Sequence, residues 1–338
     1  MPSGTTAKRL LIGAGVGLVV MLVVGFVLGA IGSAMFGTDR FLDKPAIHLP
    51  PQPVFPAATR DFHLGLVPED DRQAEVEQRG DAAAEHAPDG AESELHSTPL
   101  GINQFAVTNT LLSAWLATLV IILFFVLGSR KRSLVPGRFQ SLVETLIEAA
   151  LSFCGNVLGP EMGRKAFPVV ATIFFFVLFN AWLSLLPFYQ FLGFIYQGKI
   201  EAHLLRSAGT DLNMPLALAL ISFVFVEYWG FRVHGIGYLK KFFALGNLFR
   251  LRATGLIDAF VGFLELISEM VRVVSFTFRL FGNMTAGEIL VVMITFLVPF
   301  VAVEFVFGLE LLVGLIQAII FAALTLVFLS VAVRREGH

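Results

Sequence analysis

Two long apolar runs near the C-terminus constrain the fold of this chain more than any other feature. They extend over about residues 256–297 and 300–333 and meet at Pro299. Inside a bilayer every backbone polar group must be satisfied within the protein, so runs of this kind fold as helices. A helix of about 35 residues is about 52 Å long, whereas the hydrocarbon core is about 30 Å thick. We therefore expect a pair of steeply tilted helices, which would suit packing around a cylindrical partner.

The composition of the whole chain is that of a polytopic membrane protein. Hydrophobic residues make up 56% of the 338 positions and charged residues only 15%, which is unlike an ordinary soluble domain. The net charge of −2 offers no basic footprint for nucleic acid. Cys154 is the only cysteine, so an internal disulfide is excluded. We predict an all-α polytopic membrane protein with about six membrane helices, an interfacial helix and a long tilted C-terminal helix hairpin.

Basic clusters orient the apolar runs relative to the membrane. The segment SRKRSLVPGR at residues 129–138, the basic linker at 232–252 and Arg334 belong on the cytoplasmic side by the positive-inside rule. Residues 139–158 carry apolar side chains on one face and glutamates on another, which predicts a helix lying along the cytoplasmic surface. Both termini are then cytoplasmic. The expected spans cover about residues 10–36, 107–128, 166–188, 212–231, 256–297 and 300–333.

The first 104 residues form two regions of opposite character. Residues 1–36 are an N-terminal membrane helix or an uncleaved signal-like segment, and the length of the apolar run favours a retained helix. Two small-xxx-small spacings, Gly13/Gly17 and Gly25/Gly29, would let another helix approach closely, although glycine is also simply tolerated in membrane helices. Residues 37–104 form an acidic, Pro-rich extracytoplasmic loop with few bulky apolar residues, so we expect it to be flexible or extended.

An apolar stretch at residues 265–290 carries several charged side chains that a bilayer disfavours. A charge at membrane depth costs about 3 kcal/mol on insertion scales, so a chain that keeps several there is expected to use them. Glu265, Arg272 and Arg279 are spaced seven apart and share one stripe of the predicted helix. Arg272 lies seven residues after Glu265 and three after Glu269, so it could pair with either, and we interpret it as local charge compensation and not as a second gate.

Arg279 stands at the centre of this stripe, with Ser275 and Asn283 one turn to either side. Because arginine is not deprotonated in proteins, Arg279 is a fixed positive charge that no passing proton can neutralise. Glu288 lies nine residues on and faces another surface. One helix therefore presents a fixed cation and a titratable carboxylate on different sides.

The last apolar run carries polar groups of its own. Glu310 and Gln317 are seven apart and share a face of the predicted helix. Gln317 can satisfy a polar neighbour without changing its charge. Glu304 lies on another side, and we interpret it as an interfacial carboxylate near the outer surface.

The segment FRLFGNMTAGEIL at residues 278–290 resembles the signature of subunit a, the stator channel subunit of the rotary F-type ATP synthases. Further segments fall in the order found in that family, and the resemblance extends from about Phe105 to the C-terminus. An ordered set of this kind is far more specific than a lone arginine in a helix. The further segments are VPGRFQSLVE (135–144), FNAWLSLLP (179–187), TDLN (210–213), GIG (235–237) and the late Gln317.

The resemblance implies roles for individual residues. Arg279 corresponds to the essential arginine that prevents leakage between two offset half-channels, and Gln317 is placed opposite it. Glu288 and Glu310 correspond to titratable positions of the outer half-channel, while the amide of Asn283 orients or solvates the guanidinium. The residues expected to take part in proton translocation are Arg279, Glu288, Glu310, Gln317, Asn283, Glu265, Ser275 and Asn180.

The resemblance also implies the setting in which the chain works. Its partners would be the rotor c-ring, the peripheral stalk subunit b, other ATP synthase subunits and membrane lipid, with protons as the transported ion and no nucleic acid. The chain itself would be non-catalytic and would need no cofactor, and residues 105–338 would form its channel domain. The absence of an Arg/Ser-rich amphipathic leader favours a bacterial plasma membrane over an imported mitochondrial chain.

Two other classes of protein remain open at this point. An ion-coupled secondary transporter also keeps ionisable residues in its helices, but it would show an internal repeat with matching broken helices, and none is found. A non-transporting membrane scaffold would account for the acidic loop but not for Arg279 together with Glu288. A membrane enzyme is disfavoured because the sequence has no H-E-x-x-H zinc motif, nucleophile elbow or P-loop.

Overall fold

The fold is almost entirely helical. The computed structural model describes residues 4–37, 51–55, 106–130, 137–186, 189, 192–196, 199–238 and 253–334. Six of the helices within these ranges are long and apolar enough to cross a membrane. They are α5 (Asn109–Ser129), α6 (Arg138–Leu158), α7 (Pro160–Ser184), α9 (Asn213–His234), α12 (Ala253–Leu297) and α13 (Val301–Val333). The predicted all-α class is confirmed.

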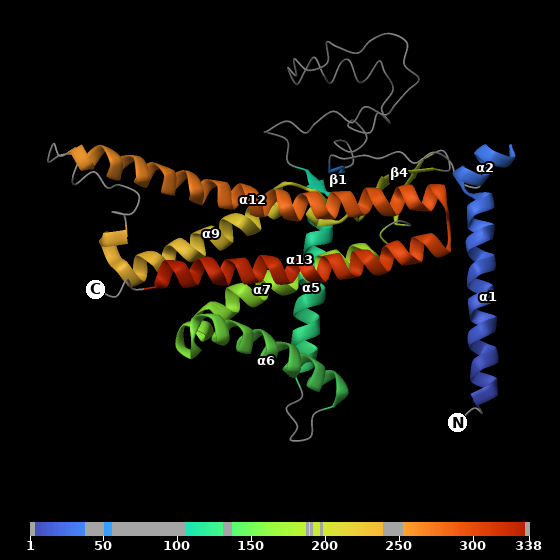
Figure 1. Ribbon diagram of the computed structural model, residues 1–338, viewed down its shortest axis with the longest axis horizontal. Coiled ribbons are helices and arrows are strands. Elements are labelled where there is room, and N and C mark those ends of the chain that lie inside the picture. Colours follow the sequence, from blue (N-terminus) through green and yellow to red (C-terminus); the bar gives the residue numbers. More distant parts are fainter. Residues whose placement is uncertain are drawn as a thin grey trace, which may run out of the picture.

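The two longest helices, α12 and α13, form an antiparallel hairpin (Figure 1). The turn between them contains Pro299, as predicted, and Phe300 adopts the left-handed region with φ 74°. Both helices run across the direction of α5 rather than along it (Figure 1). If α5 stands upright in a bilayer, the hairpin is strongly tilted, which agrees with its excess length.

The core lies where α7 and α9 pack against this hairpin. One buried cluster joins the four helices through residues such as Val177, Leu218, Leu280 and Phe321, and the rings of Phe276 and Phe321 are 4.9 Å apart between centroids. A second cluster brings in α6, and its members include Cys154, Ala166, Val226 and Leu326. Cys154 is therefore a small buried side chain, as expected of a lone cysteine in a core. These contacts fix α12 and α13 side by side.

Helix α6 is followed directly by α7 through Gly159, which has φ 80°. Because Pro160 stands in the first turn, α7 begins six residues earlier than the span predicted from residue 166. The six long apolar helices of the described residues include α6, which we expected at the membrane surface. The described side chains of the N-terminal run add a further apolar helix over Ile12–Leu28.

The N-terminal run forms two helices instead of one. Helix α1 (Gly4–Leu28) is separated from α2 (Ala30–Phe36) by Gly29, whose backbone is extended. Gly25 and Gly29 lie directly against the backbone carbonyls of Pro299 and Leu297, with no room for a side chain, so a close approach at this spacing is confirmed. Helix α1 stands apart at this end of the hairpin (Figure 1), and nothing within the described residues lies within 4 Å of a Cβ added at Gly13 or Gly17.

Two short antiparallel pairs of strands complete the fold. Strand β1 (Pro53–Phe55) pairs with β2 (Val107–Thr108), and β3 (Gly193–Tyr196) pairs with β4 (Lys199–His203). Within residues 37–104, β1 is an extended strand, and hydrogen bonds between Gln52 and Asn109 anchor its start. The rest of this loop, apart from Gly37, Pro51 and Gln52, lies outside the described residues. Pro187, the histidines of the loop and the basic residues from 239 to 252 lie outside the described residues.

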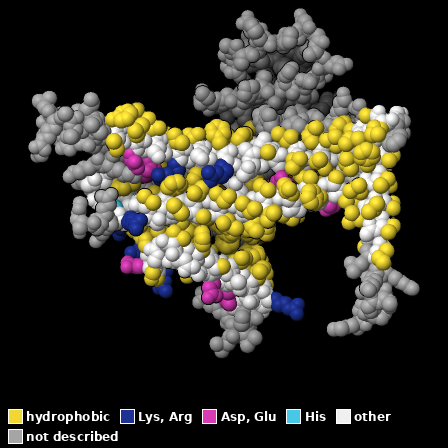
Figure 2. Space-filling model, viewed as in Figure 1, with side chains coloured by type: hydrophobic (Ala, Val, Ile, Leu, Met, Phe, Trp, Pro, Cys, Tyr) yellow, Lys and Arg dark blue, Asp and Glu magenta, His cyan; other side chains and the backbone are white. Residues whose placement is uncertain are grey.

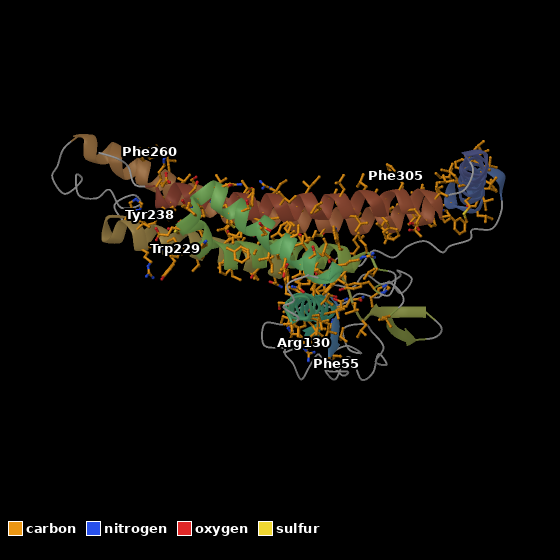
Figure 3. The ribbon with its side chains drawn as sticks, turned by 90° about the horizontal axis from the view of Figure 1, so that it is seen from below. Phe55, Arg130, Trp229, Tyr238, Phe260 and Phe305 are labelled. Carbon is orange, nitrogen blue, oxygen red and sulfur yellow. The ribbon has the colours of Figure 1, made fainter. Side chains whose placement is uncertain are left out.

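The surface of the hairpin is largely apolar. Figure 2 shows this apolar surface over α12 and α13, interrupted by basic side chains along the middle of α12. Phe260 on α12 and Phe305 on α13 lie at opposite ends of the hairpin, and both are exposed (Figure 3). An apolar surface with charges at its centre suits a partner that is itself mainly apolar but carries an opposite charge.

Candidate functional site

The central residue of the candidate site is Arg279, in the middle of α12. Its side chain is half-buried, and no residue in the described part of the chain forms a hydrogen bond or ion pair with its guanidinium. Ser275 and Asn283 flank it and are exposed. The predicted polar stripe is therefore present, and Arg279 offers an uncompensated positive charge at the surface of an apolar hairpin.

Asn283 links the two helices of the hairpin. Its Nδ2 donates a hydrogen bond of 2.8 Å to Oε1 of Gln317 on α13. We expected Asn283 to orient the guanidinium, but among the described residues it bonds Gln317 instead, and Gln317 lies opposite Asn283, one turn beyond Arg279. Gln317 is only 2% exposed, and its Nε2 has no hydrogen-bond partner within the described ranges.

Asn180 on α7 is a second buried amide. It is completely buried, and neither of its amide atoms has a partner within the described residues. The indole of Trp182 donates to the backbone carbonyl of Leu311, and Gly314 packs on Ala181, so this part of α7 lies against α13. An unsatisfied buried polar group costs about 1–3 kcal/mol, and ordered water commonly satisfies such groups. The amides of Asn180 and Gln317 are therefore suited to a hydrated path.

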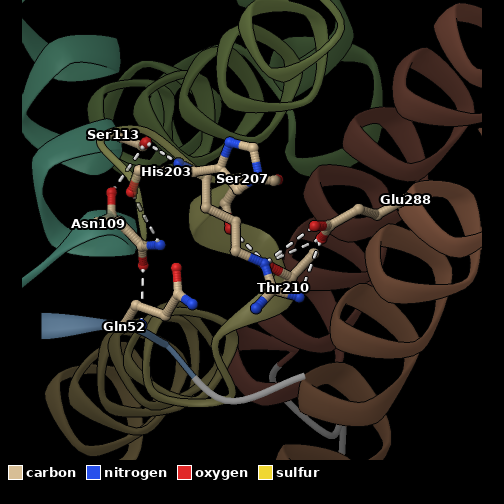
Figure 4. Close-up of polar contacts among 8 residues, drawn as sticks. Gln52, Asn109, Ser113, His203, Ser207, Thr210 and Glu288 are labelled. Carbon is tan, nitrogen blue, oxygen red and sulfur yellow. Dashed lines mark hydrogen bonds and ion pairs between the residues drawn. The ribbon is translucent and has the colours of Figure 1, made fainter. Parts of the chain in front are cut away.

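On the C-terminal side of Arg279, Glu288 forms an ion pair with Arg206. The Arg206 Nε lies 3.0 Å and 3.2 Å from the two carboxylate oxygens, and a terminal guanidinium nitrogen lies 3.2 Å from Oε2 (Figure 4). The Glu310 carboxylate, from α13, lies against Gly287, leaving no room there for a Cβ. In the described part of the chain, Glu310 has no hydrogen-bond or ion-pair partner.

On the N-terminal side of Arg279, a second group of ionisable residues is partly or fully buried. Arg272 pairs with Glu269 at 2.6 Å, one of the two partners expected from the sequence, and its guanidinium stacks on Phe328 at 3.8 Å from the ring centroid. Tyr238, which follows α9, lies beside this end of the hairpin (Figure 3) and donates to Glu227 at 3.4 Å. Burial, followed by the charges of Glu227 and Glu269, raises the pKa of Tyr238.

The structure thus arranges the predicted residues along the hairpin. Glu288, Glu310, Gln317 and Asn283 lie beyond Arg279, whereas Glu265, half-buried, lies one turn before Glu269 on the other side. Sequence reasoning missed Arg206, Glu227 and Tyr238. In the sequence, Arg206 is a single charge in a connection between helices, and Glu227 is a single glutamate in a predicted span. Neither pattern shows which residue is the partner. No group of three or more metal-ligating side chains occurs among the described residues.

The fold and the site together define a class: a polytopic membrane protein whose helices carry ionisable groups on both sides of a fixed cation, as expected of an ion-translocating subunit. The family model for the ATP synthase A chain matches residues 111–330. The chain belongs to the ATP synthase subunit a family.

The chain is similar to ATP synthase subunit a of several bacteria over most of the length of those proteins. The chain is 34% identical to ATP synthase subunit a of Gloeobacter violaceus over 229 residues, covering 68% of this chain and 84% of the relative. It is 35% identical to that of Cereibacter sphaeroides over 252 residues, covering 72% and 88%. For Helicobacter acinonychis the identity is 30% over 240 residues, covering 70% and 96%.

Membership of this family decides between the classes left open by the sequence. The chain is the proton-translocating stator subunit of Fo, a multi-pass membrane protein and a non-catalytic part of the ATP synthase complex. The secondary transporter and the scaffold are therefore discarded.

Proposed function

We propose that Arg279 is the electrostatic gate between two half-channels, one on each side of it along the α12–α13 hairpin. The observation that carries the proposal is the position of its guanidinium. It is unpaired within the described residues, and it lies between Glu288 with Glu310 on one side and Glu265 with Glu269 on the other. A permanent cation at this point attracts an ionised carboxylate of a partner and opposes direct passage of protons.

The outer half-channel carries a proton to the rotor. The proton passes Asn180, Glu288 and Glu310 and neutralises a carboxylate on the c-ring. Once neutral, the ring site can turn into lipid without the cost of a bare charge. The unsatisfied amides of Asn180 and Gln317 support a water-filled route on this side.

The inner half-channel receives the proton after the ring has turned. The ring carboxylate loses its proton near Glu265 and Glu269 and is then attracted to Arg279. Asn283 and Gln317 hold the two helices together beside the gate, and Ser275 lies one turn before it on the same stripe. Each proton contributes about 2.3 kcal/mol per 100 mV of membrane potential, and this energy appears as rotation.

The setting follows from these roles. The c-ring faces the apolar surface of α12 and α13, and the peripheral stalk subunit b and other synthase subunits complete the stator. Residues 105–338 form the channel domain, residues 1–36 a retained N-terminal membrane segment and residues 37–104 an extracytoplasmic loop. The chain lies in a bacterial plasma membrane with both termini in the cytoplasm.

ATP-driven proton pumping in inverted membrane vesicles tests the outer half-channel. We expect Glu310→Gln to lower pumping at least about tenfold, because an amide does not titrate in range. Glu304→Gln is the matched control, since Glu304 is an exposed carboxylate on the same helix, and it is expected to pump normally. Normal pumping by Glu310→Gln, or equal losses in both variants, would contradict the proposed outer route.

A further inference from the structure

Arg206 holds the carboxylate of Glu288 from a distant part of the chain. Eighty-two residues separate the two, and three contacts of 3.0–3.2 Å join the guanidinium to both carboxylate oxygens. The side chain of Arg206 is 10% exposed and that of Glu288 is 36% exposed. The cation is therefore the buried member of the pair, and the carboxylate is the accessible one.

The segment that carries Arg206 is clamped between α5 and α12. The backbone N–H of Arg206 donates to Oγ of Ser113 at 3.0 Å, and Ser113 in turn donates to the carbonyl of Asn109 (Figure 4). A few residues on, Gly209 in the 3-10 turn η1 (Ala208–Thr210) packs on Met284, so closely that a Cβ would lie 2.6 Å from its side chain. Arg206 is thus a fixed element of the site and not a mobile surface arm.

Among the described residues, few other ionisable groups lie on the elements packed around Glu288. Helix α13 contributes Glu310, whose carboxylate lies against the neighbouring Gly287. Helix α5 contributes uncharged polar groups here, such as Asn109 and Ser113. The end of β4 contributes His203 and the segment after it contributes Asp211, which is already bonded to Thr110 and Asn213. Arg206 is the cation bound to Glu288, beside a second carboxylate with no described partner.

We propose that Arg206 is a positioning residue of the outer half-channel: it balances the charge of Glu288, so that Glu310 is the carboxylate left to bind and release the proton. This inference rests on the proposed function and assigns different roles to the two carboxylates. Because a guanidinium stays charged at every working pH, the balance does not change as protons pass. Arg206 thereby sets the pH range over which the outer side takes up protons.

Electrostatics gives the direction of each substitution. With Arg206 removed, two neighbouring carboxylates share the site, and like charges favour binding of a proton at higher pH. With Glu288 neutralised, the positive charge of Arg206 is no longer balanced and disfavours binding of a proton to Glu310. Glu310 then binds its proton only at a lower pH. Removing both charges restores the balance.

The experiment measures passive proton conductance in inverted vesicles after the catalytic head is stripped away. A lumen-positive potassium diffusion potential drives protons out while the pH of the lumen, the outer side, is varied. We expect the midpoint of the conductance profile to rise by about one pH unit in Arg206→Gln and to fall by a similar amount in Glu288→Gln. We expect the midpoint to stay close to that of the unsubstituted chain in Arg206→Lys, which keeps the charge, and in the double variant R206Q/E288Q.

Several outcomes would overturn the inference. A lower amplitude with an unchanged midpoint in Arg206→Gln would mean that Arg206 only supports the fold. If the midpoint of the double variant shifts as far as that of Arg206→Gln, the effect of Arg206 does not act through Glu288. If Arg206→Gln does not assemble, the downward shift in Glu288→Gln is the deciding measurement. Arg232→Gln is the control, because Arg232 is exposed and bonds Tyr228 at the other end of α9. Failure of the proposed function itself would appear separately, as normal conductance in Glu310→Gln.

Discussion

Two glutamate–arginine pairs within the described residues, Glu269–Arg272 and Glu288–Arg206, are built in opposite ways. In the pair on the N-terminal side of Arg279, Glu269 is 3% exposed and Arg272 is 17% exposed, whereas in the other pair Arg206 is the buried member and Glu288 the open one. The first pair is local to one turn of α12, and the second joins α12 to a distant connection. The comparison suggests that the local pair stabilises the helix packing and that the long-range pair tunes an accessible carboxylate.

The largest effect is expected from breaking the local pair. Arg272→Gln leaves the nearly buried Glu269 carboxylate without its cation, and removing one member of a buried pair costs about 3–5 kcal/mol. We expect little assembled subunit and a much lower temperature of half-inactivation in detergent. The double variant E269Q/R272Q should recover part of this loss, since no unpaired charge remains. A single variant as stable as the original chain would show that Glu269–Arg272 is not a structural pair.

A smaller loss is expected where the N-terminal helices meet the hairpin. Gly29 lies against the carbonyl of Leu297, so Gly29→Leu must displace α2 or the turn, and overpacking of this kind costs about 1–3 kcal/mol. Gly17→Leu is the matched control because it lies in open space. Thermal inactivation of the purified complex should distinguish the two variants. Equal stability would mean that this contact does not support the hairpin.

The smallest change in stability is expected at Gly287, next to the accessible carboxylate of Glu288. Gly287→Ala pushes the flexible end of Glu310 aside, so we expect nearly unchanged thermal stability but about tenfold slower proton conduction, because a carboxylate displaced by about 1 Å transfers protons poorly. Gly308→Ala, on α13 in open space, should conduct normally. Unchanged conduction in Gly287→Ala would mean that the position of Glu310 is not critical.

The sequence predicted those features that depend on local spacing. Arg272 and Glu269 are three apart on one helix, Pro299 marks the turn of the hairpin, and the apolar runs are too long for upright spans. The family resemblance added the central place of Arg279. Helix periodicity and positive-inside reasoning were sufficient for these predictions.

Contacts between distant segments were beyond the sequence. Nothing in the pattern around Arg206 or Glu288 shows that they meet, because their pairing depends on how the segment after β4 packs between α5 and α12. The same holds for β1, which pairs with β2 and is preceded by Gln52, the residue that Asn109 binds. The break at Gly29 and the bond from Asn283 to Gln317 likewise arise from tertiary packing, which overrides local propensity.

The central claim is that Arg279 is a gate, and its most direct test is Arg279→Ala in membrane vesicles. ATP-driven proton pumping is recorded first, and passive proton leak is then recorded after the catalytic head has been stripped away. The account predicts that pumping disappears while passive leak persists or rises, because the fixed charge that separates the half-channels has been removed. Pumping at a normal rate would contradict it.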